Sequence, residues 1–335
     1  MASTGRGRSG PGSDGRVPPP SSHGRVRRAI GRTLPRWAKP RLGEMRGQYR
    51  PRPLSVPARY QRTRPPDPSP YVSIVTPSLN HREFIERTIR SLLSQHYPRL
   101  QYVVMDGGSD DGTQEVIERY ADRLHHFESG PDSGQAAAIN AGFAHSDGEI
   151  MGWLNSDDLL LPSALAYIAQ MFVQHPEVDL VYGHRILLDE RDRDVGLWVT
   201  PAFSPDLIRW FDYLPQETVF WRRRLWERAG GIDETIDVAF DWDLFLRFQE
   251  SGATIRRLPR FLGAFRLHPG QRTRVHHDAA QHELAAIRER WNGRTVGLDE
   301  ARSRVDGVRL RSLPHYVWHR VSSSIPIGRM PVLPS

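Results

Sequence analysis

The carboxylates of Asp157 and Asp158 are the groups in this sequence whose type and placement most clearly suggest chemistry. They follow an apolar, strand-like run over residues 150–154. In open α/β sheets, ligands bind beyond the carboxyl ends of the strands, where two carboxylates can hold a hard divalent cation together with substrate phosphates. The same placement also suits a helix start, because an aspartate before an apolar segment is a common cap. The pair therefore predicts either a metal site or a helix cap at a strand end.

Asp106 is a second acidic residue at the end of an apolar run, here residues 101–105. Its carboxylate could accept hydrogen bonds from a base or a ribose, and the glycines that follow would allow close approach of a ligand. The residue types at positions 106–112 are also common in turns, so a plain turn is the alternative. Residues 77–81 stand where a dinucleotide site has its glycine-rich turn, and no G-x-x-x-x-G-K-[ST] motif occurs. Neither NAD nor a P-loop nucleotide is therefore indicated.

Alternating strands and helices are expected to position these groups. Apolar and β-branched runs predict four strands, over residues 71–76, 101–105, 124–127 and 150–154. Helical spacing of apolar residues predicts three intervening helices: one capped by Asn80, one carrying Val116 and Ile117, and one over residues 135–144. This alternation predicts an α/β fold with a Rossmann-like, mostly parallel sheet flanked by helices.

Composition limits what the chain can do. Its 335 residues suffice for one large or two small domains, and 38% of them are hydrophobic, enough to form a core. The absence of cysteine excludes disulfides, thiolate metal sites and a cysteine nucleophile. No apolar run approaches the roughly 20 residues that span a bilayer. We therefore expect a protein that is soluble or bound peripherally to a membrane.

Positive charge is concentrated in residues 1–66. This segment holds fifteen arginines and Lys39 against Asp14 and Glu44, a net charge of +14, which leaves −7 for the rest of the chain. It is rich in proline, glycine and serine, so we expect a disordered basic N-terminal tail. Such a tail could contact an anionic membrane or only keep the chain in solution, and no nucleic-acid partner is expected.

Four segments along the chain carry a family resemblance. They are VSIVTPSLN at residues 72–80, DGGSDDGT at residues 106–113, DSGQAAAINAG at residues 132–142 and WLNSDD at residues 153–158. In this order and spacing they resemble the family 2 glycosyltransferases, and the resemblance extends over residues 71–275. It implies a GT-A fold, a nucleoside-diphosphate sugar as donor, a divalent cation (Mn²⁺ or Mg²⁺) and inverting transfer to an acceptor hydroxyl.

The resemblance also assigns donor-site roles position by position. The residues that it places around the nucleotide and the sugar are Thr76, Pro77, Asn80, Asp106, Gly107, Ser109, Gly134, Gln135, Asn140, Trp153 and Asn155. Asn155, Ser156 and Asp157 stand in the place of the family's Asp-x-Asp metal motif, although Asn155 carries no charge. The resemblance therefore puts the cation on Asp157, with Asp158 as a supporting group. It adds His268, which follows a late strand at a position where relatives carry a histidine.

The acceptor side of the resemblance lies in the second half of the chain. Asp241 aligns with the family's catalytic carboxylate, and such a group can take the proton that the acceptor hydroxyl loses as it attacks the sugar. Asp243 is the competing candidate, and capping a helix is the structural alternative for Asp241. The other residues assigned to the acceptor or diphosphate side are Gln216, Glu217, Trp242 and Arg247.

These assignments divide the chain into three regions. Residues 1–66 form the basic tail and residues 67–275 the GT-A domain, whose donor half covers 71–160 and whose acceptor half covers 161–275. In residues 276–335 we expect a helix over 276–291, docked through apolar residues, and then an irregular segment packed on the domain or on a membrane surface.

The sequence thus predicts an inverting glycosyltransferase with a carbohydrate or lipid-linked acceptor, in bacterial envelope polysaccharide, glycolipid or glycoconjugate synthesis. It would work in the cytoplasm, or bound peripherally at the inner face of the membrane. A nucleotidyltransferase would also need a Rossmann-like sheet and metal carboxylates, but the missing basic phosphate loop disfavours it. A non-catalytic carbohydrate- or nucleotide-binding protein is the second alternative, suggested by the neutral Asn155.

Overall fold

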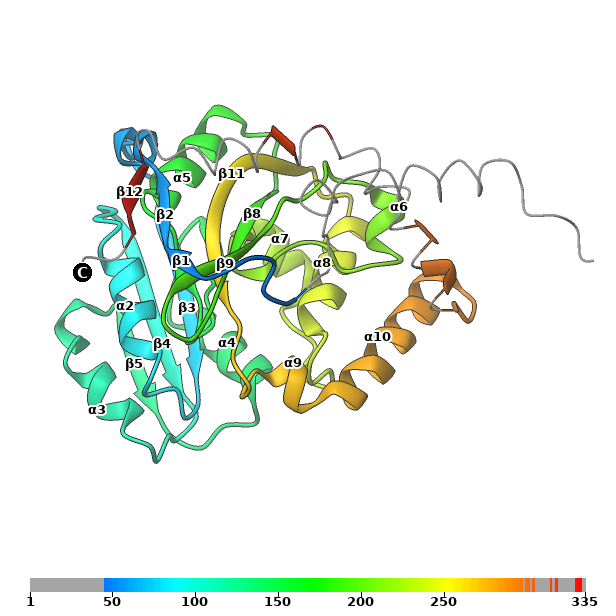
Figure 1. Ribbon diagram of the computed structural model, residues 1–335, viewed down its shortest axis with the longest axis horizontal. Helices are drawn as coiled ribbons and strands as arrows, with labels where there is room; N and C mark the ends of the chain where they lie inside the picture. Colours follow the sequence, from blue (N-terminus) through cyan, green and yellow to red (C-terminus); the bar gives the residue numbers. More distant parts are fainter. Residues whose placement is uncertain are drawn as a thin grey trace, which may run out of the picture. The chain divides into compact units, whose positions relative to one another are not determined.

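A mixed sheet forms the centre of the fold (Figure 1). The computed structural model describes residues 45–297, 299–301, 303–304, 314, 317–318 and 329–332, all within the compact unit Pro40–Ser335. Over these residues, the ten strands of the sheet are β1 (Arg52–Pro53), β3 (Val72–Ser78), β4 (Leu100–Asp106), β5 (His126–Ser129), β6 (Ile150–Trp153), β7 (Leu159–Leu160), β8 (Leu180–Leu188), β9 (Arg193–Trp198), β10 (Phe220–Arg222) and β11 (Ile255–Arg266). Their order is β1-β9-β8-β10-β6-β3-β4-β5, with β11 beside β8 and β7 beside β11.

Helices cover this sheet. Among the described residues they are α2 (Ile85–Leu93), α3 (Thr113–Glu118), α4 (Gln135–Ala144), α5 (Ala164–Gln174), α6 (Pro205–Ile208), α7 (Arg223–Ala229), α8 (Phe240–Glu250), α9 (Arg272–Val275) and α10 (His277–Asn292), with short 3-10 turns η2 (Ala58–Arg62), η3 (Ala121–Arg123) and η4 (Gln216–Thr218). Their apolar sides supply the two large clusters of buried residues that fill the fold.

The donor half is a parallel sheet buried on both faces. Strands β6, β3, β4 and β5 pair in parallel in that order. Ile74 and Val104 pack with α2, α3 and α5, whereas Val75 and Val103 pack with α4 and α8. Because successive side chains of a strand point to opposite faces, an uninterrupted apolar strand such as β3 needs helices on both sides. All four strands end at the same edge, and this places their following loops together.

The predicted strands and helices of this half are found with small shifts in their ends. Strand β3 runs two residues beyond the predicted end, to Ser78, and β5 begins at His126 rather than at Leu124. The prediction that Asn80 caps the first helix is wrong, because α2 begins at Ile85 after Phe84. Asn80 has a left-handed backbone with φ of 54°, and its Oδ1 accepts a hydrogen bond from the Asp110 backbone N–H at 3.0 Å. The amide therefore joins two loops instead of starting a helix.

The acceptor half continues the same sheet with a change of direction. Strand β10 lies antiparallel between β6 and β8, and the long β11 runs parallel to β8 and antiparallel to β7. The pairing of β11 with β7 brings the loop after β11 back to the loop after β6. Two segments more than a hundred residues apart, near Asp157 and His268, therefore meet.

Residues 45–66 belong to this body, and the prediction of a disordered tail over residues 1–66 is wrong for them. Strand β1 pairs with β9, and β2 (Ser55–Pro57) pairs with β12 (Arg329–Pro331), as the blue segment in Figure 1 shows. Leu54, Val56 and Tyr60 are buried in a third apolar cluster. Their apolar side chains are too widely spaced in the sequence to indicate a strand or helix, and only packing reveals their role. Residues 1–44 lie outside the described part of the chain.

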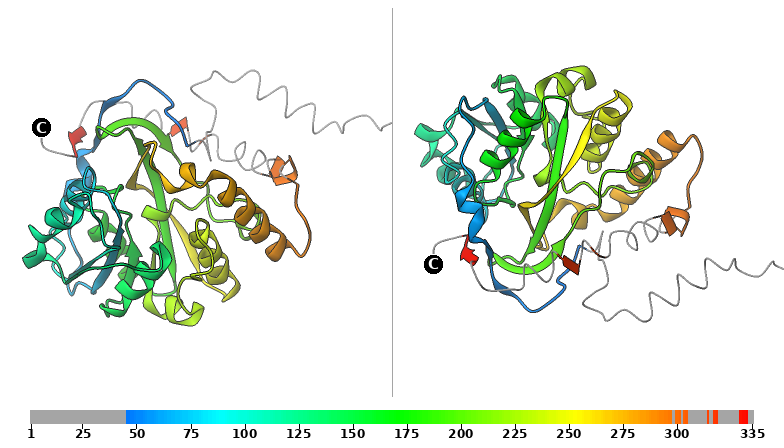
Figure 2. Two further views of the ribbon diagram at one scale, coloured as in Figure 1. Left: turned by 90° about the horizontal axis from the view of Figure 1, so that it is seen from below. Right: turned by 90° about the horizontal axis from the view of Figure 1, so that it is seen from above.

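Helix α10 lies along the acceptor half (Figure 2). Ile287 is buried in the main core, and Leu284 and Trp291 pack against it. Between residues 310 and 333 the structure describes residues 314, 317–318 and 329–332, of which Val317 and Val332 pack on the third cluster. No helix in the described residues combines the length and the apolar character that crossing a bilayer requires.

Candidate active site

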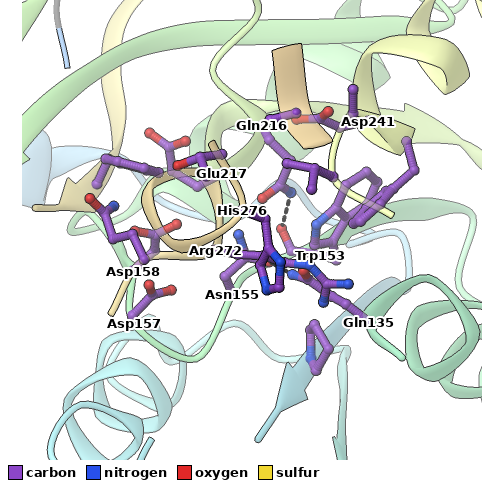
Figure 3. A pocket seen from close by; sticks show the side chains of 18 of the residues that line it. Gln135, Trp153, Asn155, Asp157, Asp158, Gln216, Glu217, Asp241, Arg272 and His276 are labelled. Atoms are coloured by element: carbon purple, nitrogen blue, oxygen red, sulfur yellow. Dashed lines mark hydrogen bonds between the residues drawn. The ribbon is translucent and has the colours of Figure 1, made fainter. Parts of the chain in front are cut away.

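A cavity of about 540 Å³ opens where the strands of the donor half end. This volume is in the range of small-molecule sites. The predicted site residues that line it are Pro77, Gly134, Gln135, Trp153, Asn155, Asp157, Gln216, Glu217 and Asp241. Figure 3 shows that they come from both halves of the fold, with Asp157 in the loop after β6 and Asp241 at the start of α8. The cavity therefore joins the predicted donor side to the predicted acceptor side.

Asp157 lies in a group of side chains that could hold a cation. Its Oδ2 is 2.9 Å from Nε2 of His268, the other residue predicted to bind metal. One ligand atom each of His81, Asp157 and His268 lies within 4.8 Å of the other two. Burial alone would raise the pKa of Asp157, but the hydrogen bond with His268 and the nearby imidazoles hold that pKa below its usual value. The carboxylate is therefore kept ionised, as a metal ligand must be.

Asp158 is buried beside Asp157 and also lines the cavity. Its Oδ1 accepts a hydrogen bond from the Arg266 backbone N–H at 3.1 Å, and its backbone carbonyl accepts one from the Thr88 hydroxyl at 2.7 Å. Burial, and then the charge of Asp157, raise the pKa of Asp158 well above its usual value. The buried Arg266 also donates from Nε to the Asp157 carbonyl at 2.8 Å. Asp158 and Arg266 thus fix the loop that carries Asp157.

Asn155 and Trp153 make hydrogen bonds that cross the cavity wall. Asn155 Oδ1 accepts from Gln135 Nε2 at 2.8 Å, and the Trp153 carbonyl accepts from Gln216 Nε2 at 2.8 Å, the bond dashed in Figure 3. The amide of Asn155 is therefore already bonded to α4. It adds no negative charge where the resemblance expects a carboxylate.

Several predicted donor residues do not line the cavity; these are Thr76, Asn80, Asp106, Gly107, Ser109 and Asn140. The Asp106 carboxylate accepts from the Ser109 backbone N–H and hydroxyl at 2.9 and 2.5 Å and from the Ser129 hydroxyl at 2.7 Å. The Ser109 hydroxyl accepts in turn from the Asn80 backbone N–H at 2.8 Å. These bonds hold the loops after β3, β4 and β5 together, and the role of the residues as donor contacts stays a prediction.

The side chains of Thr76 and Asn140 also form hydrogen bonds with other parts of the protein. The buried Thr76 hydroxyl accepts from the Tyr102 hydroxyl at 3.2 Å. Asn140 donates to the Ile232 carbonyl at 3.0 Å and accepts from the Ile232 backbone N–H at 2.9 Å, so it ties α4 to the loop before α8. Asn140 therefore connects the two halves of the fold.

The structure separates the two candidate bases, Asp241 and Asp243. Asp241 is half-buried and lines the cavity, and burial raises its pKa to about 6. Asp243 is completely buried and is paired with Arg247 at 2.7 Å and with Arg290 at 3.4 Å. Asp241 lies inside the first turn of α8, where its Oδ1 accepts from the Trp242 backbone N–H at 2.8 Å. Of the two, only Asp241 has a carboxylate facing the cavity.

Trp242 and Arg247 do not line the cavity, and their assignment to the acceptor or diphosphate side stays a prediction. Trp242 is completely buried, and its Nε1 donates to the Ile208 carbonyl at 2.6 Å. Arg247 donates to the carbonyls of Ala229 and Gly231 at 2.8 and 2.7 Å, besides its pair with Asp243. The reason is their place on α8, because only the N-terminal end of this helix, at Phe240 and Asp241, lines the cavity.

Glu217 and Asp212 complete the acceptor wall, and the sequence predicted only the first of them. Buried Arg185 donates to both carboxylate oxygens of Glu217, from Nε at 2.8 Å and from Nη2, and so neutralises it. Burial and the charge of Asp241 raise the pKa of Asp212 well above its usual value. Among the described residues, Asp212 Oδ1 is a buried oxygen without a hydrogen-bond partner. No sequence pattern points to Asp212, since it lies in an irregular loop.

Arg272 and His276 also line the cavity, although neither was predicted. Arg272 begins α9 and is paired with the exposed Asp237, and His276 lies between α9 and α10. The cavity wall thus continues past residue 275, the predicted domain end, through His276, Ala280 and Leu284. Arginine is so frequent in this chain that Arg272 could not be distinguished by type alone.

The model of the family described as Glycosyl transferase family 2 matches residues 73–224, which hold the strands and loops of the donor side. The chain carries a family 2 glycosyltransferase domain. Among the relatives of the chain, the O-antigen biosynthesis protein RfbC of Myxococcus xanthus is 32% identical over 56% of the chain, but the match spans only 15% of RfbC. The uncharacterized glycosyltransferase Rv1514c of Mycobacterium tuberculosis is 29% identical over 53% of the chain and 69% of its own length.

Solved glycosyltransferase structures share the fold. Staphylococcus aureus TarS in complex with UDP superposes with a TM-score of 0.51 at 19% identity, over 77% of this chain and 74% of that one. The mannosyltransferase PcManGT of Pyrobaculum calidifontis, in complex with GDP-Man and Mn²⁺, gives 0.51 at 18% identity, over 81% and 82%. The predicted GT-A fold and the resemblance to family 2 are therefore confirmed.

Proposed function

We propose that the protein is an inverting glycosyltransferase that moves a sugar from a nucleoside-diphosphate sugar to a hydroxyl of a carbohydrate or lipid-linked acceptor. The observation that carries this proposal is the presence of Asp157, beside two imidazoles, and of Asp241 on the wall of one cavity. The first group suits a cation and the second suits a proton acceptor. The O-antigen relative favours envelope polysaccharide, glycolipid or glycoconjugate synthesis on the cytoplasmic side of a bacterial membrane.

The donor would lie along the ends of β3 and β6. Pro77, Gly134 and Gln135 line this part of the cavity, and the loops behind them are held by Asp106 and Asn80. Rigid loops reduce the ordering cost of binding a nucleotide. TarS and PcManGT contain UDP and GDP-Man, which supports a nucleoside diphosphate here without choosing the base.

A divalent cation, Mn²⁺ or Mg²⁺, fits the residues beside the diphosphate. Asp157 and His268 supply one carboxylate and one imidazole, which are ordinary ligands of such ions. When bound, the cation would stabilise the negative charge that builds on the leaving diphosphate. Arg272 and His276 replace Arg247 as the protein groups that can contact the diphosphate, because they line the cavity and Arg247 does not.

Asp241 is the proposed base. The acceptor oxygen would form its bond to the anomeric carbon from the face opposite the diphosphate while the bond from sugar to phosphate breaks. The proton of the hydroxyl would pass to the Asp241 carboxylate, and the nucleoside diphosphate would leave with the bonding electrons. A carboxylate whose pKa is about 6 is ionised at neutral pH and still basic enough to assist this transfer.

Nucleoside-diphosphate release tests the proposed activity. The full chain is incubated with a panel of nucleoside-diphosphate sugars and Mn²⁺, and free nucleoside diphosphate is measured. Slow release that requires both the cation and Asp241 is expected. Pyrophosphate released from a nucleoside triphosphate would instead support a nucleotidyltransferase, and binding of a donor without any turnover would support a non-catalytic binding protein.

The basic N-terminal region is proposed to contact anionic membrane. Residues 1–44 alone carry a net charge of +8, and each arginine near an anionic surface contributes about 1 kcal/mol before salt screening. Deletion of residues 1–44 leaves the packed segment 45–66 in place. This deletion should weaken salt-sensitive sedimentation with phosphatidylserine liposomes and leave donor hydrolysis unchanged. Equal sedimentation of both proteins would contradict the proposal.

A further inference from the structure

Three elements bring His81, Asp157 and His268 together at one side of the cavity. His81 follows β3, Asp157 follows β6 and His268 follows β11. Their candidate ligand atoms all lie within 4.8 Å of one another, and the centroids of the two imidazole rings are 6.0 Å apart. Such a spacing lets one ion reach all three side chains with small rotations. The metal assignment by resemblance includes Asp157 and His268 but not His81.

Rigid surroundings hold the His81 imidazole at this position. Its backbone N–H donates to the Thr113 hydroxyl at 2.9 Å, and its carbonyl accepts from the backbone N–H groups of Phe84 and Ile85, both at 2.9 Å. The Phe84 ring packs against both imidazoles, with centroid distances of 6.1 Å to His81 and 4.7 Å to His268. The two rings therefore share one apolar support, which restricts their orientation.

The neutral Asn155 leaves the cation with one carboxylate ligand fewer than the family motif provides. It stands where the family motif has its first carboxylate, and its Oδ1 is bonded to Gln135 at 2.8 Å. Asp158 also lines the cavity, but its Oδ1 is bonded to the Arg266 backbone N–H, and Asp157 is the carboxylate of this loop that is grouped with the two imidazoles. With Asn at position 155, the segment 155–157 supplies one carboxylate where the family's Asp-x-Asp motif would supply two. An imidazole from another strand can supply the missing ligand without adding charge.

We propose that His81 is a third protein ligand of the cation and that the two imidazoles make the site select transition ions over Mg²⁺. This inference rests on the proposed function, because it concerns the cation of the same reaction. Imidazole nitrogen binds first-row transition ions well, whereas Mg²⁺ prefers oxygen ligands and keeps its water. The affinity should therefore rise from Mg²⁺ through Mn²⁺ to Co²⁺. An acid-rich site would discriminate less between Mg²⁺ and Mn²⁺.

Direct metal titration tests the inference without reference to turnover. Binding of Mn²⁺ to the full chain is followed by electron paramagnetic resonance, with Mg²⁺ and Co²⁺ as competitors. His81→Asn and His81→Gln each keep an amide that can bond to Ser156, which lies 2.5 Å from His81 Nδ1, but lack the imidazole. Both should raise the Kd for Mn²⁺ at least about tenfold, a loss that even an outer partner of a metal ligand can cause. The preference for Mn²⁺ over Mg²⁺ should shrink with it.

A matched control comes from the second histidine group on the surface. His126, Glu128 and His145 also lie within 4.8 Å of one another but do not line the cavity. His126→Asn should leave the tight Mn²⁺ site and its ion preference unchanged. The converse change, Asn155→Asp, restores a carboxylate and should raise the affinity for Mg²⁺ more than that for Mn²⁺. Thermal unfolding of each variant verifies that it is folded.

The outcomes separate this inference from the proposed function. If the His81 variants are folded and bind Mn²⁺ with unchanged affinity and preference while His268→Asn loses the ion, His81 is only a hydrogen-bond partner of Ser156 and the inference is wrong. The proposed transferase would still stand in that case. If the wild-type protein releases nucleoside diphosphate but binds no Mn²⁺ even with nucleoside diphosphate present, the cation and this inference both fail.

Discussion

The two carboxylate centres of the cavity lie in opposite electrostatic surroundings. Asp157 is next to the imidazoles of His81 and His268, which hold its pKa below the usual value. Asp241 is half-buried beside Asp212, and burial raises its pKa to about 6. Titratable groups whose surroundings push their pKa values apart are expected to have different roles. This difference supports the proposal that the first holds a cation and that the second accepts a proton.

The same contrast appears in how each carboxylate is supported. The loop of Asp157 is fixed by hydrogen bonds to Arg266 and Thr88, which come from other elements of the fold. Asp241 is fixed by its place in the first turn of α8. A ligand on a braced loop keeps its geometry, whereas a base at a helix start is open to the incoming acceptor. The predictions below test this contrast, in order of decreasing effect.

Replacing the proposed base should have the largest effect. Asp241→Asn is nearly isosteric and keeps an oxygen that can bond to the Trp242 backbone, so we expect unchanged donor binding. The rate of transfer should fall by about 10²- to 10⁴-fold, the usual cost of losing a general base. Nucleoside-diphosphate release at saturating donor measures this. A nearly normal rate would show that Asp241 is not the base.

Replacing the Asp157 carboxylate should abolish the added stabilisation that Mn²⁺ provides. In Asp157→Asn we expect a folded protein in which Mn²⁺ no longer adds to the stabilisation by a nucleoside diphosphate. At about 100 times its Kd, a ligand stabilises a protein by about 2.7 kcal/mol, so the lost shift is readily seen. Thermal unfolding with and without Mn²⁺ provides the measurement. Retention of the Mn²⁺-dependent shift in this variant would contradict the assignment of the centre.

Asp243 offers a matched control for Asp241, two residues along the same helix. Asp243→Asn breaks the ion pairs with Arg247 and Arg290, so it should lower the free energy of unfolding by about 2 kcal/mol. A fully buried pair would cost more, but both arginines reach solvent. The rate per folded molecule should stay near that of the wild type. Denaturant unfolding measures the stability, and the release assay measures the rate. If Asp243→Asn loses its rate at unchanged stability, Asp243 rather than Asp241 is the base.

The pH dependence of the rate should reflect the ionisation of Asp241, and it is the smallest effect of the four predictions. The base must be ionised, so kcat/KM should rise with pH through about 6 and level off above it. Below the midpoint the rate should fall about tenfold per pH unit, as for a single titrating group. Mn²⁺ binding is measured over the same pH range, so that loss of the cation at low pH is not mistaken for protonation of Asp241. A midpoint near 4 with Mn²⁺ saturating would contradict the elevated pKa.

Much of the donor half could be predicted from residue pattern. Apolar runs of β3, β4 and β6 are continuous because helices cover both faces, and α4 begins and ends at the predicted residues. The polar groups at the strand ends, including Asp106 and Asp157, follow from the same pattern. Asn80 was misjudged because a cap and a loop bridge use the same side-chain oxygen. Only the left-handed backbone and the bond to Asp110 distinguish them.

The site residues of the acceptor half were harder to predict, because their positions depend more on contacts between distant segments. Asp241, Trp242 and Arg247 are close in sequence, but of the three only Asp241, at the start of α8, lines the cavity. Asp212 lies in an irregular loop, and His276 follows β11, the last strand of the ten-stranded sheet. Local patterns say little about such positions, because their surroundings are built from segments that are far apart in the chain.

The sequence by itself determined the α/β class, the edge of the sheet where polar groups gather, and the family resemblance. These depend on the spacing of apolar residues and on short motifs, which are local. Tertiary structure alone decided that His81 joins Asp157 and His268, that Asp212 lies beside Asp241, and that residues 45–66 pack on the body. The physical reason is that pKa values, metal sites and burial depend on neighbours in space, and here those neighbours come from distant parts of the chain.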